Sequence, residues 1–533
     1  MASTVVVDSS DGSRSPLHSP TRQNGIPISL ESRRRKRTVA DDFGKYEIGV
    51  LLTTQLSYIP IACTMLSTSF YKPTETFCAE FQKSNSSSLS EFQNNAEGEF
   101  RSLLIEWDEG CSTSIILASF SSIIMLGALV GAFSAGWLAD VYGRKPVVRG
   151  CLIFLSFGNL IFSFVASFSW YLTALLLFVL GMACGGYMVT NLVLLVECLE
   201  SPNSRLLSVS LNGWSISMVF VALIAYISQD WFFYHLAISA LALVATFACQ
   251  YLTFESCRWL ASVHRLSDAK LIASRISLRN GSVVNAELAW HELLGFHLPI
   301  ARTPEKELVH PRRYGYSDLF SFPSVYKPLI SLCYCFVASS IVSFGFYFVV
   351  DMLPGDRYSN MGVMGLLKFS LGLLPFLVSP WMGRKPIATI SLVIACIALW
   401  TLCFTQFFGI SPTSISVTLL SILVAAALDP TWKILHLYSA ELFPTVVRNM
   451  ARGICNVGAR LGSVAAPMIV HLRLQHYLLP FIIFAFLLSI QLLVVMFSLP
   501  ETKNRPLPDR LLEENEKENG VFTLETVEIN NEL

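Results

Sequence analysis

Charge is scarce in this chain. Only 14% of its 533 residues are charged, whereas 53% are hydrophobic. A soluble protein of this length needs far more charge to cover its surface. The scarcity of charge therefore excludes an ordinary soluble domain and indicates a membrane protein.

Several other features are missing. The nucleotide-binding pattern Gly-x-x-x-x-Gly-Lys-Ser/Thr does not occur, and no group of residues has the spacing of metal ligands. We therefore expect no cofactor, no metal, no ATP-driven step and no enzymatic activity. The first 40 residues also lack the apolar core of a cleaved signal peptide, so we expect the first apolar run to act as the anchor.

What fills the chain instead is long apolar runs. A helix of about 20 apolar residues crosses the roughly 30 Å hydrocarbon core of a bilayer. Twelve runs meet this length, six on each side of a polar gap at 255–327. We expect spans at about 48–70, 114–138, 148–168, 171–196, 206–228, 232–254, 328–350, 358–379, 386–406, 413–438, 451–474 and 477–499.

The two sets of six runs are related by an internal repeat. The tetrapeptide Gly-Arg-Lys-Pro occurs at 143–146 and again 240 residues later, at 383–386. Two further matches follow in the same order: Glu197 and Arg205 match Glu441 and Arg448, and residues 254–256 match 500–502. Parallel repeats of membrane helices are typical of transporters that hold the substrate between two halves. The sequence thus predicts an all-α membrane protein with twelve transmembrane helices in two six-helix halves.

Lys and Arg predict the orientation. Residues 33–37 are all basic and the gap at 255–327 holds ten Lys or Arg, whereas the loop at 71–113 holds three against eight acids. Positive residues stay inside, so we expect both termini and 255–327 in the cytoplasm and 71–113 outside. The basic run then contacts anionic lipid rather than nucleic acid. The expected domains are a disordered N-terminus 1–42, a first half 43–254, a cytoplasmic loop 255–327, a second half 328–502 and a tail 503–533.

The expected outer loop carries two kinds of covalent site. Cys78 and Cys111 are the only cysteines placed on the oxidising side, and we expect a disulfide between them, with two free thiols as the alternative. Asn85 begins a glycosylation sequon in the same loop. Asn280 begins another, but on the cytoplasmic side, where it stays unmodified.

Residues 136–145, between the second and third runs, closely match the signature loop of the major facilitator superfamily. Its glycines permit a tight turn, and its charges pair with charges at neighbouring helix ends. We expect these pairs to hold the cytoplasmic side closed and to break when it opens; solvated loop charges are the alternative. The expected gating residues are Asp140, Arg144, Glu197, Arg205, Glu255 and Arg258 in the first half and Arg384, Glu441, Arg448 and Glu501 in the second. Pro380 takes the place of Asp140 in the second half.

Further motifs resemble a narrower family. They are Phe43-Gly44-Lys45-Tyr46, Cys78, Glu106-Trp107, Cys111, and the stretches 255–260, 441–449 and 500–508. Together they are similar to the organic cation, organic anion and carnitine transporters, over residues 43 to 508. Two departures are the missing prolines of 255–260 and Leu177, which replaces an Arg common in that family. The resemblance implies a small organic ion as substrate and leaves its charge open.

Ionisable residues at bilayer depth are expensive, so each is a candidate for function. The second half contains Lys368, Asp429, Lys433, His436 and Arg460 in its apolar runs. At 1.5 Å per residue, Lys368, Lys433 and Arg460 lie about 22, 12 and 18 Å from the cytoplasmic face, near the bilayer midplane.

Arg460 is the strongest candidate for binding the substrate. It occupies the position where the cation carriers of the family have Asp, whereas the anion and carnitine carriers resemble this chain in having Arg. A carboxylate or sulfate, bound by both arms of the guanidinium, would neutralise it. Lys368, which stands where the family usually has an acid, and Lys433 are the accompanying cations, and Phe336, Phe344 and Tyr187 are the expected aromatic lining.

Plainer interpretations stay open for some of these groups. Asp429 and Lys433 are four residues apart on one helix face, so mutual neutralisation is the alternative to a role in substrate binding. His436 fits a hydrogen-bonded packing residue better than a proton carrier. We expect a plasma-membrane carrier that moves an organic anion or zwitterion by alternating access, as a uniporter or exchanger. The alternatives are an organic cation carrier, which Asp429 would serve, and a receptor or scaffold that has lost transport.

Overall fold

The structure is a computed structural model of the whole chain. It describes residues 43–84, 88–94, 100–111, 115–199, 202–211, 213–263, 265–281, 318–350, 353–408, 415–443 and 447–503. The expected disordered N-terminus, the tail and the glycosylation sequon at Asn85 lie outside these residues. The described part is helical throughout, apart from an isolated bridge between Arg101 and Asp230.

The predicted all-α fold is confirmed. Twelve helices in the described part are long and apolar enough to cross a membrane, and their ends lie within a few residues of the expected ones. They are Lys45–Phe70, Ile116–Tyr142, Arg144–Phe168, Trp170–Cys198, Leu206–Ser228, Trp231–Leu252, Pro323–Val349, Arg357–Val378, Arg384–Thr405, Ile415–Ser439, Met450–Leu474 and Leu479–Phe497. The largest shift is at the seventh span, α16 (Pro323–Val349), where the helix takes in Pro328 instead of starting there.

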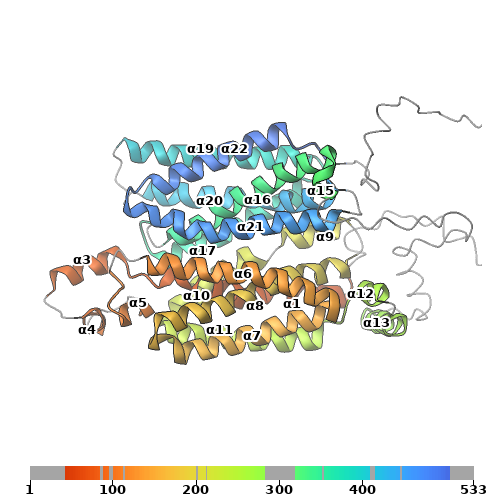
Figure 1. Cartoon of the computed structure of the whole chain (residues 1–533), viewed down its shortest axis with the longest axis horizontal. Coiled ribbons are helices and arrows are strands. Elements are labelled where there is room, and N and C mark those ends of the chain that lie inside the picture. The colour runs from red at the N-terminus through yellow and green to blue at the C-terminus, as the bar shows by residue number, and fades with distance from the viewer. Residues whose placement is uncertain are drawn as a thin grey trace, which may run out of the picture.

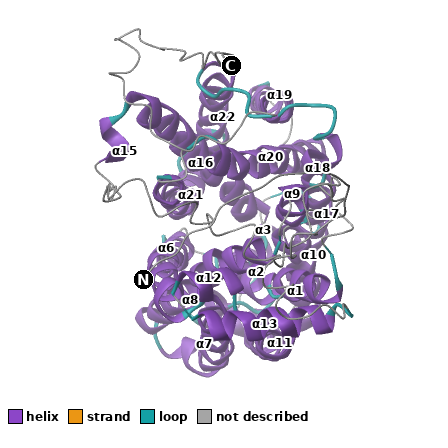
Figure 2. Cartoon of the chain, turned by 90° about the vertical axis from the view of Figure 1, so that its right-hand side faces the viewer, coloured by secondary structure: helices purple, strands orange, loops and turns teal. Residues whose placement is uncertain are grey.

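The spans form two bundles that lie against each other (Figure 1). One bundle contains α1 (Lys45–Leu56), α2 (Tyr58–Leu66), α6 (Ile116–Tyr142), α7 (Arg144–Val165), α8 (Trp170–Cys198), α9 (Pro202–Ser210), α10 (Gly213–Ser228) and α11 (Trp231–Leu252). The other contains α16, α17 (Arg357–Gly372), α18 (Leu374–Val378), α19 (Arg384–Phe407), α20 (Ile415–Glu441), α21 (Arg448–His471) and α22 (Leu479–Phe497). Figure 2 shows the same division from one end of the bundles.

The two ends of the molecule are easily told apart. We name the outer-loop end after residues 71–113, which hold the short helices α3 (Glu75–Lys83), α4 (Leu89–Asn94) and α5 (Leu103–Glu106) (Figure 1). We name the opposite end the signature-loop end, because Gly143 and Gly383 lie there. At that end α12 (Cys257–Ser262) and α13 (Leu266–Arg279) lie beside the first bundle.

Three spans are broken in the described part, which the apolar pattern does not predict. The eighth span changes from α17 to α18 at Leu373. The first span changes from α1 to α2 at Ser57 and ends in the 3-10 turn η3 (Ser67–Phe70). The fifth span is interrupted between α9 and α10. Its piece α9 contacts α18 and α20 of the other bundle, so it connects the two bundles at the signature-loop end.

Within the first bundle, α6 and α8 approach closely. Glycines on both helices leave the room: a Cβ atom on Gly131 or Gly185 would lie 2.0 Å from a backbone carbonyl oxygen of the other helix, and one on Gly127 or Gly181 would lie 2.1 Å away. Small residues allow such close helix packing in membranes. The pair α6 and α8 therefore forms a tightly packed unit.

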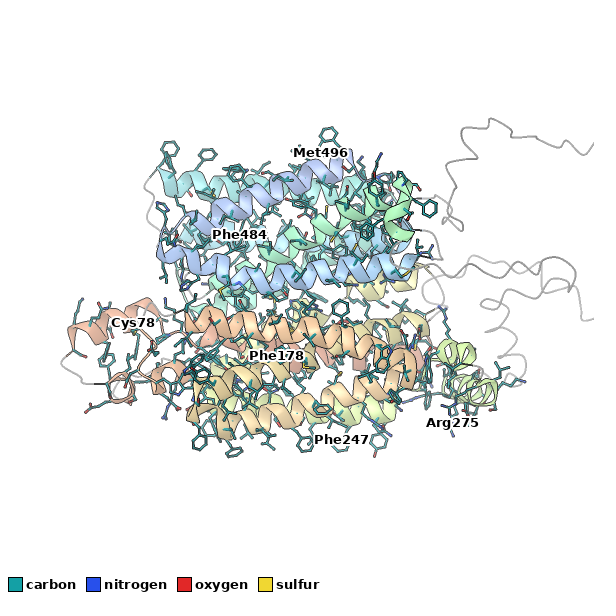
Figure 3. The ribbon with its side chains drawn as sticks, in the orientation of Figure 1. Cys78, Phe178, Phe247, Arg275, Phe484 and Met496 are labelled. Carbon is teal, nitrogen blue, oxygen red and sulfur yellow. A yellow bond between two sulfur atoms is a disulfide. The ribbon has the colours of Figure 1, made fainter. Side chains whose placement is uncertain are left out.

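Large apolar side chains cover the flanks of both bundles (Figure 3). Phe247 and Met496, on opposite flanks, are 55% and 41% exposed. Contact with lipid tails costs such side chains no free energy, whereas contact with water does. The exposed apolar flanks therefore fit a protein surrounded by lipid.

The outer-loop segment is held together covalently. Cys78 and Cys111 form a disulfide, with their Cα atoms 5.5 Å apart. Beside it, an oxygen of Asp108 accepts a hydrogen bond from the backbone N–H of Leu89 at 2.8 Å. Phe77, Leu89 and Ile105 form a small buried core under these links.

Asn280 has a structural role at the signature-loop end. Its Oδ1 accepts from the backbone N–H of Tyr46 at 2.8 Å, and its Nδ2 donates to Glu47 at 2.9 Å. The side chain thus caps the start of α1 from a distant part of the chain. The Asn280 side chain is therefore engaged by the start of α1.

Candidate functional site

The candidate site lies between the bundles, where α6 contacts α21 and α10 contacts α17. Ser122 Oγ of α6 donates to the backbone oxygen of Val464 on α21 at 2.9 Å. On the other side, a Cβ at Gly365 of α17 would lie 2.8 Å from the Cβ of Met218 on α10. The bundles are thus in direct contact on both sides of the groups described next.

Arg460 points from α21 toward the first bundle. Its Nη2 lies 3.4 Å from the sulfur of Met188 on α8, and Tyr58 of α2 and Cys184 of α8 are its other polar neighbours. Among the described residues no carboxylate pairs with Arg460. The guanidinium therefore faces the junction of the two bundles with neutral groups around it.

The expected lining residue Tyr187 is engaged by the protein itself. Its hydroxyl donates to the backbone oxygen of Thr54 at 2.9 Å, and its ring packs edge-on against Tyr58, with 5.5 Å between the centroids. The helix break at Ser57 places Tyr58 between Tyr187 and Arg460. Tyr58, rather than Tyr187, is thus the aromatic residue that interacts with the Arg460 charge.

Lys368, Asp429 and Lys433 form one buried cluster across α17 and α20. Lys368 Nζ lies 3.3 Å from one Asp429 oxygen, and Lys433 Nζ lies 3.6 Å from the other. Lys368 Nζ also donates to the backbone oxygen of Ala425 at 3.0 Å. Asp429 and Lys433 are thus paired, and Lys368 shares the same carboxylate, so two basic side chains lie against one acid.

Aromatic residues connect this cluster to the first bundle. The Lys368 Nζ lies 5.4 Å from the centre of the Tyr347 ring, within the range of a cation–π contact. Tyr347 in turn packs against Phe344 at 5.4 Å and accepts a hydrogen bond from Trp214 of α10 at 3.3 Å. The predicted residue Phe344 is therefore linked to Lys368 through the Tyr347 ring.

His436 lies between the two groups of cations. The charged groups that act on its ring include Lys433 and Arg460. The predicted residue Phe336 packs edge-on against His436, with 5.1 Å between the rings, and is fully buried. The structure thus brings Lys368, Lys433 and Arg460 into one region rich in positive charge, with Phe336 as a packing residue behind it.

At the signature-loop end, Arg144 is the centre of the first network. It pairs with Glu197 at 3.3 Å and with Asp140 at 3.0 Å, and its backbone N–H donates to Glu255 at 3.0 Å. Gly143 adopts φ 108°, and an added Cβ would lie 2.4 Å from a Glu255 oxygen, so the turn requires glycine. Arg258 follows in α12, and the side chain of Arg205 lies outside the described residues.

The second half repeats the arrangement. Arg384 pairs with Glu441 at 3.5 Å, and its backbone N–H donates to Glu501 at 2.9 Å. Where the first half has Asp140, the Ser379 hydroxyl accepts from Arg384 at 3.4 Å, which partly replaces the missing acid. Arg448 donates to the backbone oxygen of Phe443 at 3.2 Å. The ion pairs of Arg144 and of Arg384 each join residues of a single half.

The environment of Glu501 favours its ionised form. Burial alone raises the pKa of this carboxyl, but backbone N–H groups of Lys503, Arg384, Lys385 and Thr502 donate to it and hold its pKa below the usual value. The carboxylate is therefore a stable acceptor for the turn that begins α19.

Sequence reasoning missed four residues of the site: Tyr58, Trp214, Tyr347 and Arg452. Tyr347 lies three residues after Phe344, on the same helix face, which is a usable signal. Arg452, eight residues before Arg460 on α21, also acts on His436; it is the second residue of the expected span 451–474 but was not among the selected charges. Nothing in the sequence links Tyr58 or Trp214 to the cations, because those contacts cross between the bundles.

Solved structures with this architecture are known. The chain is similar to the proton:xylose symporter XylE bound to 6-bromo-6-deoxy-D-glucose, with a TM-score of 0.62 and 16% identity over 87% of this chain and 98% of that one. It is also similar to the inward open conformation of the xylose transporter XylE from E. coli, with a TM-score of 0.60 and 16% identity over 86% and 98% of the two chains. At such low identity these structures show the fold alone.

Relatives of known name are organic ion carriers. The chain is 30% identical to a beta-alanine transporter of Drosophila melanogaster, over 76% of this chain and 65% of that protein. It is 26% identical to organic anion transporter 3 of Mus musculus, over 77% and 74%, and 27% identical to an organic cation transporter protein of Drosophila melanogaster, over 77% and 73%. The expected resemblance to organic ion carriers is thus confirmed.

The family itself follows from a match over most of the chain. Residues 63–510 match the model of the sugar (and other) transporter family, whose members are transporters and not enzymes. Together with the twelve spans and the repeated loops, the match shows a secondary transporter of small solutes. The chain belongs to the sugar (and other) transporter family of the major facilitator superfamily.

Proposed function

We propose that this protein carries a small organic anion or zwitterion across the plasma membrane, with Arg460 binding the anionic group of the substrate. The observation that carries the proposal is the position of Arg460 between the bundles, with no carboxylate partner among the described residues. A cation in a poorly hydrated site is costly unless an anion neutralises it. The substrate supplies that anion.

The surrounding charges support an anionic substrate. Lys368 and Lys433 share one carboxylate, and Arg452 adds another cation on the same helix as Arg460. A positive excess of this kind attracts anions and repels simple cations. A zwitterion also fits, because the rings of Phe344, Tyr347 and Trp214 offer a face to an ammonium group. The named beta-alanine and organic anion transporters among the relatives point to the same two classes.

The organic cation alternative is less well supported. It depends on Asp429, and both oxygens of Asp429 already lie within 3.6 Å of a lysine Nζ. A substrate cation would have to displace either Lys433, on the same helix as Asp429, or Lys368, on the neighbouring helix α17. A relative named as an organic cation transporter nevertheless makes this the alternative to test.

The transport cycle follows from the two bundles. Substrate bound between them becomes exposed to either side as the bundles rock, by uniport or exchange. In the proposed orientation the signature-loop end and both termini lie in the cytoplasm, and the outer loop carries a glycan on Asn85. The ion pairs of Arg144 and Arg384 then fasten helix ends within each half, so that each half moves as a unit.

The test is uptake of labelled substrates by Arg460 variants. Arg460→Ala should lower the apparent affinity for a substrate with a carboxylate, such as the zwitterion beta-alanine, by about tenfold to a hundredfold, since a lost charge-assisted hydrogen bond costs about 1.5–3 kcal/mol. Arg460→Lys should recover only part of the lost affinity, because an ammonium group is a point charge whereas a guanidinium group is planar and donates two parallel hydrogen bonds. Arg460→Asp should abolish anion uptake.

The matched control is Arg149→Ala. Arg149 lies on α7 and donates to Gln250 at an exposed position, so its loss tests the removal of an arginine outside the site. Surface biotinylation of each variant separates folding from binding. Normal surface level with unchanged anion affinity in Arg460→Ala would exclude the proposed role of Arg460 and the anion assignment with it.

A further inference from the structure

Arg452 is a second arginine on α21, just over two helical turns from Arg460 toward the signature-loop end. Eight residues separate the two arginines, which is about 12 Å along the helix axis and about 80° around it. One side of α21 therefore carries two cations in succession, the first at the bundle junction and the second nearer to the signature-loop end.

The side of α21 that carries Arg452 is turned away from lipid. Leu461 and Met468 of the same helix are 52% and 37% exposed on the flank of the bundle. They lie about 180° and 160° around the helix axis from Arg452. On the inner side, both Arg452 and Arg460 act on the ring of His436 on α20. Arg452 therefore points into the protein, and His436 is a neighbour that the two arginines share.

The charge of Arg452 is not matched by an acid. Among the described residues, Arg448 and Cys455 are the titratable groups that act on Arg452, and no carboxylate pairs with it. Arg448 lies four residues earlier on α21, and like charges at this spacing destabilise a helix. An anion beside Arg452 would offset both this repulsion and the cost of placing a cation inside a membrane protein.

On the outer-loop side of Arg460, contacts between the bundles close the path. Ser122 Oγ donates to the backbone oxygen of Val464, one turn beyond Arg460, at 2.9 Å. Ser69 Oγ of η3 donates to the backbone oxygen of Tyr347 at 3.4 Å. Both hydrogen bonds join one bundle to the other.

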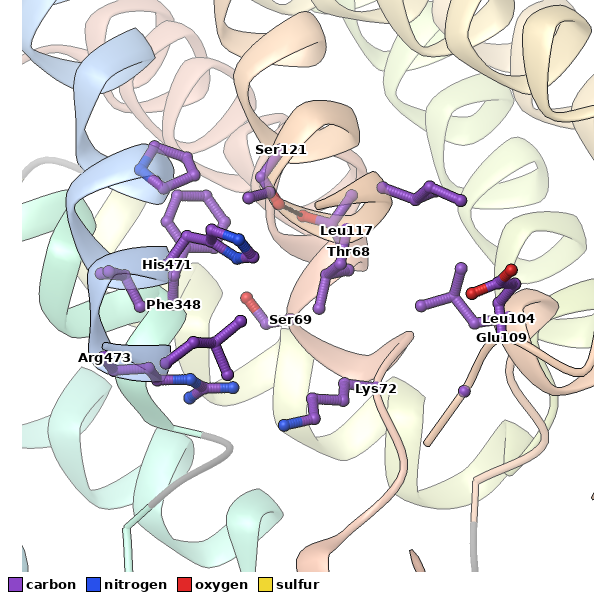
Figure 4. A pocket seen from close by; sticks show the side chains of 16 residues that line it. Thr68, Ser69, Lys72, Leu104, Glu109, Leu117, Ser121, Phe348, His471 and Arg473 are labelled. Atoms are coloured by element: carbon purple, nitrogen blue, oxygen red, sulfur yellow. Dashed lines mark hydrogen bonds between the residues drawn. The ribbon is translucent and has the colours of Figure 1, made fainter. Parts of the chain in front are cut away.

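A pocket lies at the outer-loop end of these contacts (Figure 4). Its lining residues on α21 begin at Pro467, beyond Val464, and Ser69 is part of its wall. Ser121, also on the wall, donates to the hydroxyl of Thr68 at 2.9 Å, as Figure 4 shows. The contacts thus separate this pocket from the bundle junction, whereas Arg452 lies on the other side of the junction.

We propose that Arg452 is a second binding position for the carboxylate of the substrate, on the path between Arg460 and the signature-loop end. A carboxylate that leaves the guanidinium of Arg460 is bound next by that of Arg452, and His436 lies beside this path. The proposal rests on the proposed function, because it uses the same substrate class. It adds a second site, which acts on one side of the bundle junction only.

The first measurement is protection of a thiol by a carboxylate. Asn456 lies on α21 four residues from each arginine and is partly exposed, so Asn456→Cys places a thiol beside the proposed position. The full chain in detergent is labelled with the uncharged reagent N-ethylmaleimide, with the parent protein as background. Propanoate at about ten times its dissociation constant leaves about a tenth of the sites free, so it should slow the labelling about tenfold.

Arginine variants assign the protection to one position. It should persist in Arg460→Ala and disappear in Arg452→Gln. Arg149→Gln is the matched control and should leave it unchanged, because Arg149 donates to Gln250 at an exposed position outside the path. Survival of the protection in Arg452→Gln, or its loss in Arg149→Gln, would overturn the assignment to Arg452.

Arg452→Lys guards against a folding defect. This variant keeps the positive charge and should weaken protection by propanoate severalfold, because an ammonium group does not donate two parallel hydrogen bonds to a carboxylate. Size-exclusion chromatography checks the fold of each variant. If Arg452→Gln gives no folded protein, unchanged protection in Arg452→Lys overturns the proposal.

Chloride distinguishes a carboxylate site from a site for an inorganic ion. At the same concentration it should protect Asn456→Cys less than propanoate does, since a carboxylate accepts two parallel hydrogen bonds from a guanidinium. Equal protection by chloride would make Arg452 a site for an inorganic anion and overturn the carboxylate assignment.

Transport from each side tests the place of Arg452 on the path. Beta-alanine uptake is measured in vesicles that expose the outer-loop end and in vesicles that expose the signature-loop end. Arg452→Gln should lower the apparent affinity from the signature-loop end about tenfold and leave the affinity from the other end unchanged. Equal losses from both ends would make Arg452 part of the central site and overturn a separate position.

Arg460→Ala separates the failure of one proposal from that of the other. In this variant uptake should fall while protection of Asn456→Cys by propanoate persists. Unchanged apparent affinity from both ends in Arg460→Ala refutes the proposed function. Loss of protection in Arg460→Ala refutes a position at Arg452 that is separate from Arg460.

Discussion

At the scale of single residues, the membrane makes charge informative. The sequence alone was sufficient to select Lys368, Lys433 and Arg460, because ionisable side chains in apolar runs are rare and costly. It did not reveal that Lys368 reaches Asp429 on another helix, nor that Tyr347 lies under Lys368. Contacts across helices depend on how the bundle packs, and one sequence holds no record of that.

Asp429 holds the buried cluster together. In Asp429→Asn, Lys368 and Lys433 lose their shared counter-charge, and breaking a buried pair costs about 3–5 kcal/mol. We expect a lower melting temperature in detergent and little protein at the surface. Adding Lys433→Met, which removes one of the two stranded cations, should restore part of the stability.

The same variant distinguishes an anion carrier from a cation carrier. If Asp429 binds a substrate cation, Asp429→Asn should stay stable and lose cation uptake. Thermal unfolding followed by size-exclusion chromatography, together with uptake of a labelled cation, decides between these outcomes.

At the scale of elements, most helices follow from hydropathy and the loops from their motifs. The twelve spans agree with the expected runs because length and apolar content determine which segments enter a bilayer. The breaks at Ser57, between α9 and α10 and at Leu373 were not predicted, because a few polar residues, such as Gln55 and Ser57 in the first span, do not end an apolar run. The positions of the repeated loops were predicted. The hydrogen bond from Arg384 to Ser379, which partly replaces the missing acid, was not.

The signature loop predicts unequal effects of its two charges. Asp140 is 75% exposed, whereas Arg144 is 12% exposed and also contacts Glu197. An exposed pair contributes about 0–1 kcal/mol, so Asp140→Ala should reduce the maximal transport rate only mildly. Arg144→Ala leaves Glu197 without this partner and should reduce the rate about tenfold or more.

The measurement is initial uptake rate normalised to surface protein. Arg384→Ala in the second half is the matched variant, and it should behave like Arg144→Ala, because Arg384 makes the equivalent contacts with Glu441 and Glu501. Equal effects of Asp140→Ala and Arg144→Ala would show that burial does not set the importance of these charges.

At the scale of the whole molecule, the structure shows one arrangement of two bundles. They are joined at the outer-loop end by a buried arginine: Arg357 of α17 donates to the backbone oxygen of Lys72 at 3.0 Å. Its guanidinium also lies 5.9 Å from the centres of the Phe70 and Phe100 rings. The sequence predicts the two halves but not the end of the molecule at which they are closed. The arrangement closed at the outer-loop end and the one closed at the signature-loop end use the same helices.

Arg357 should control how often the outer-loop end opens. Arg357→Ala removes a charge-assisted hydrogen bond and ring contacts, together on the order of 1.5–3 kcal/mol. Ser69 lies at the contact between the bundles, where its hydroxyl donates to the backbone oxygen of Tyr347. We expect a cysteine placed at Ser69 to react with a membrane-impermeant thiol reagent at least about tenfold faster in this variant.

Arg101→Ala serves as the control for Arg357→Ala. Arg101 lies at the same end and pairs with Glu106 and Asp230, but all three belong to the first half. Its removal should leave the reactivity at Ser69 unchanged. An equal increase in both variants would mean that general loosening, rather than loss of the link between the bundles, exposes position 69.

The close approach of α6 and α8 has a practical consequence for spectroscopy. Where glycines bring the two backbones into contact, neither helix can slide or tilt without collision. Two probes placed on the lipid side of α6 and α8 should therefore keep a constant separation through the entire cycle. Such a pair would serve as an internal reference for distance measurements across the bundles. Any spread in its measured separation reports the mobility of the labels and not a displacement of the helices.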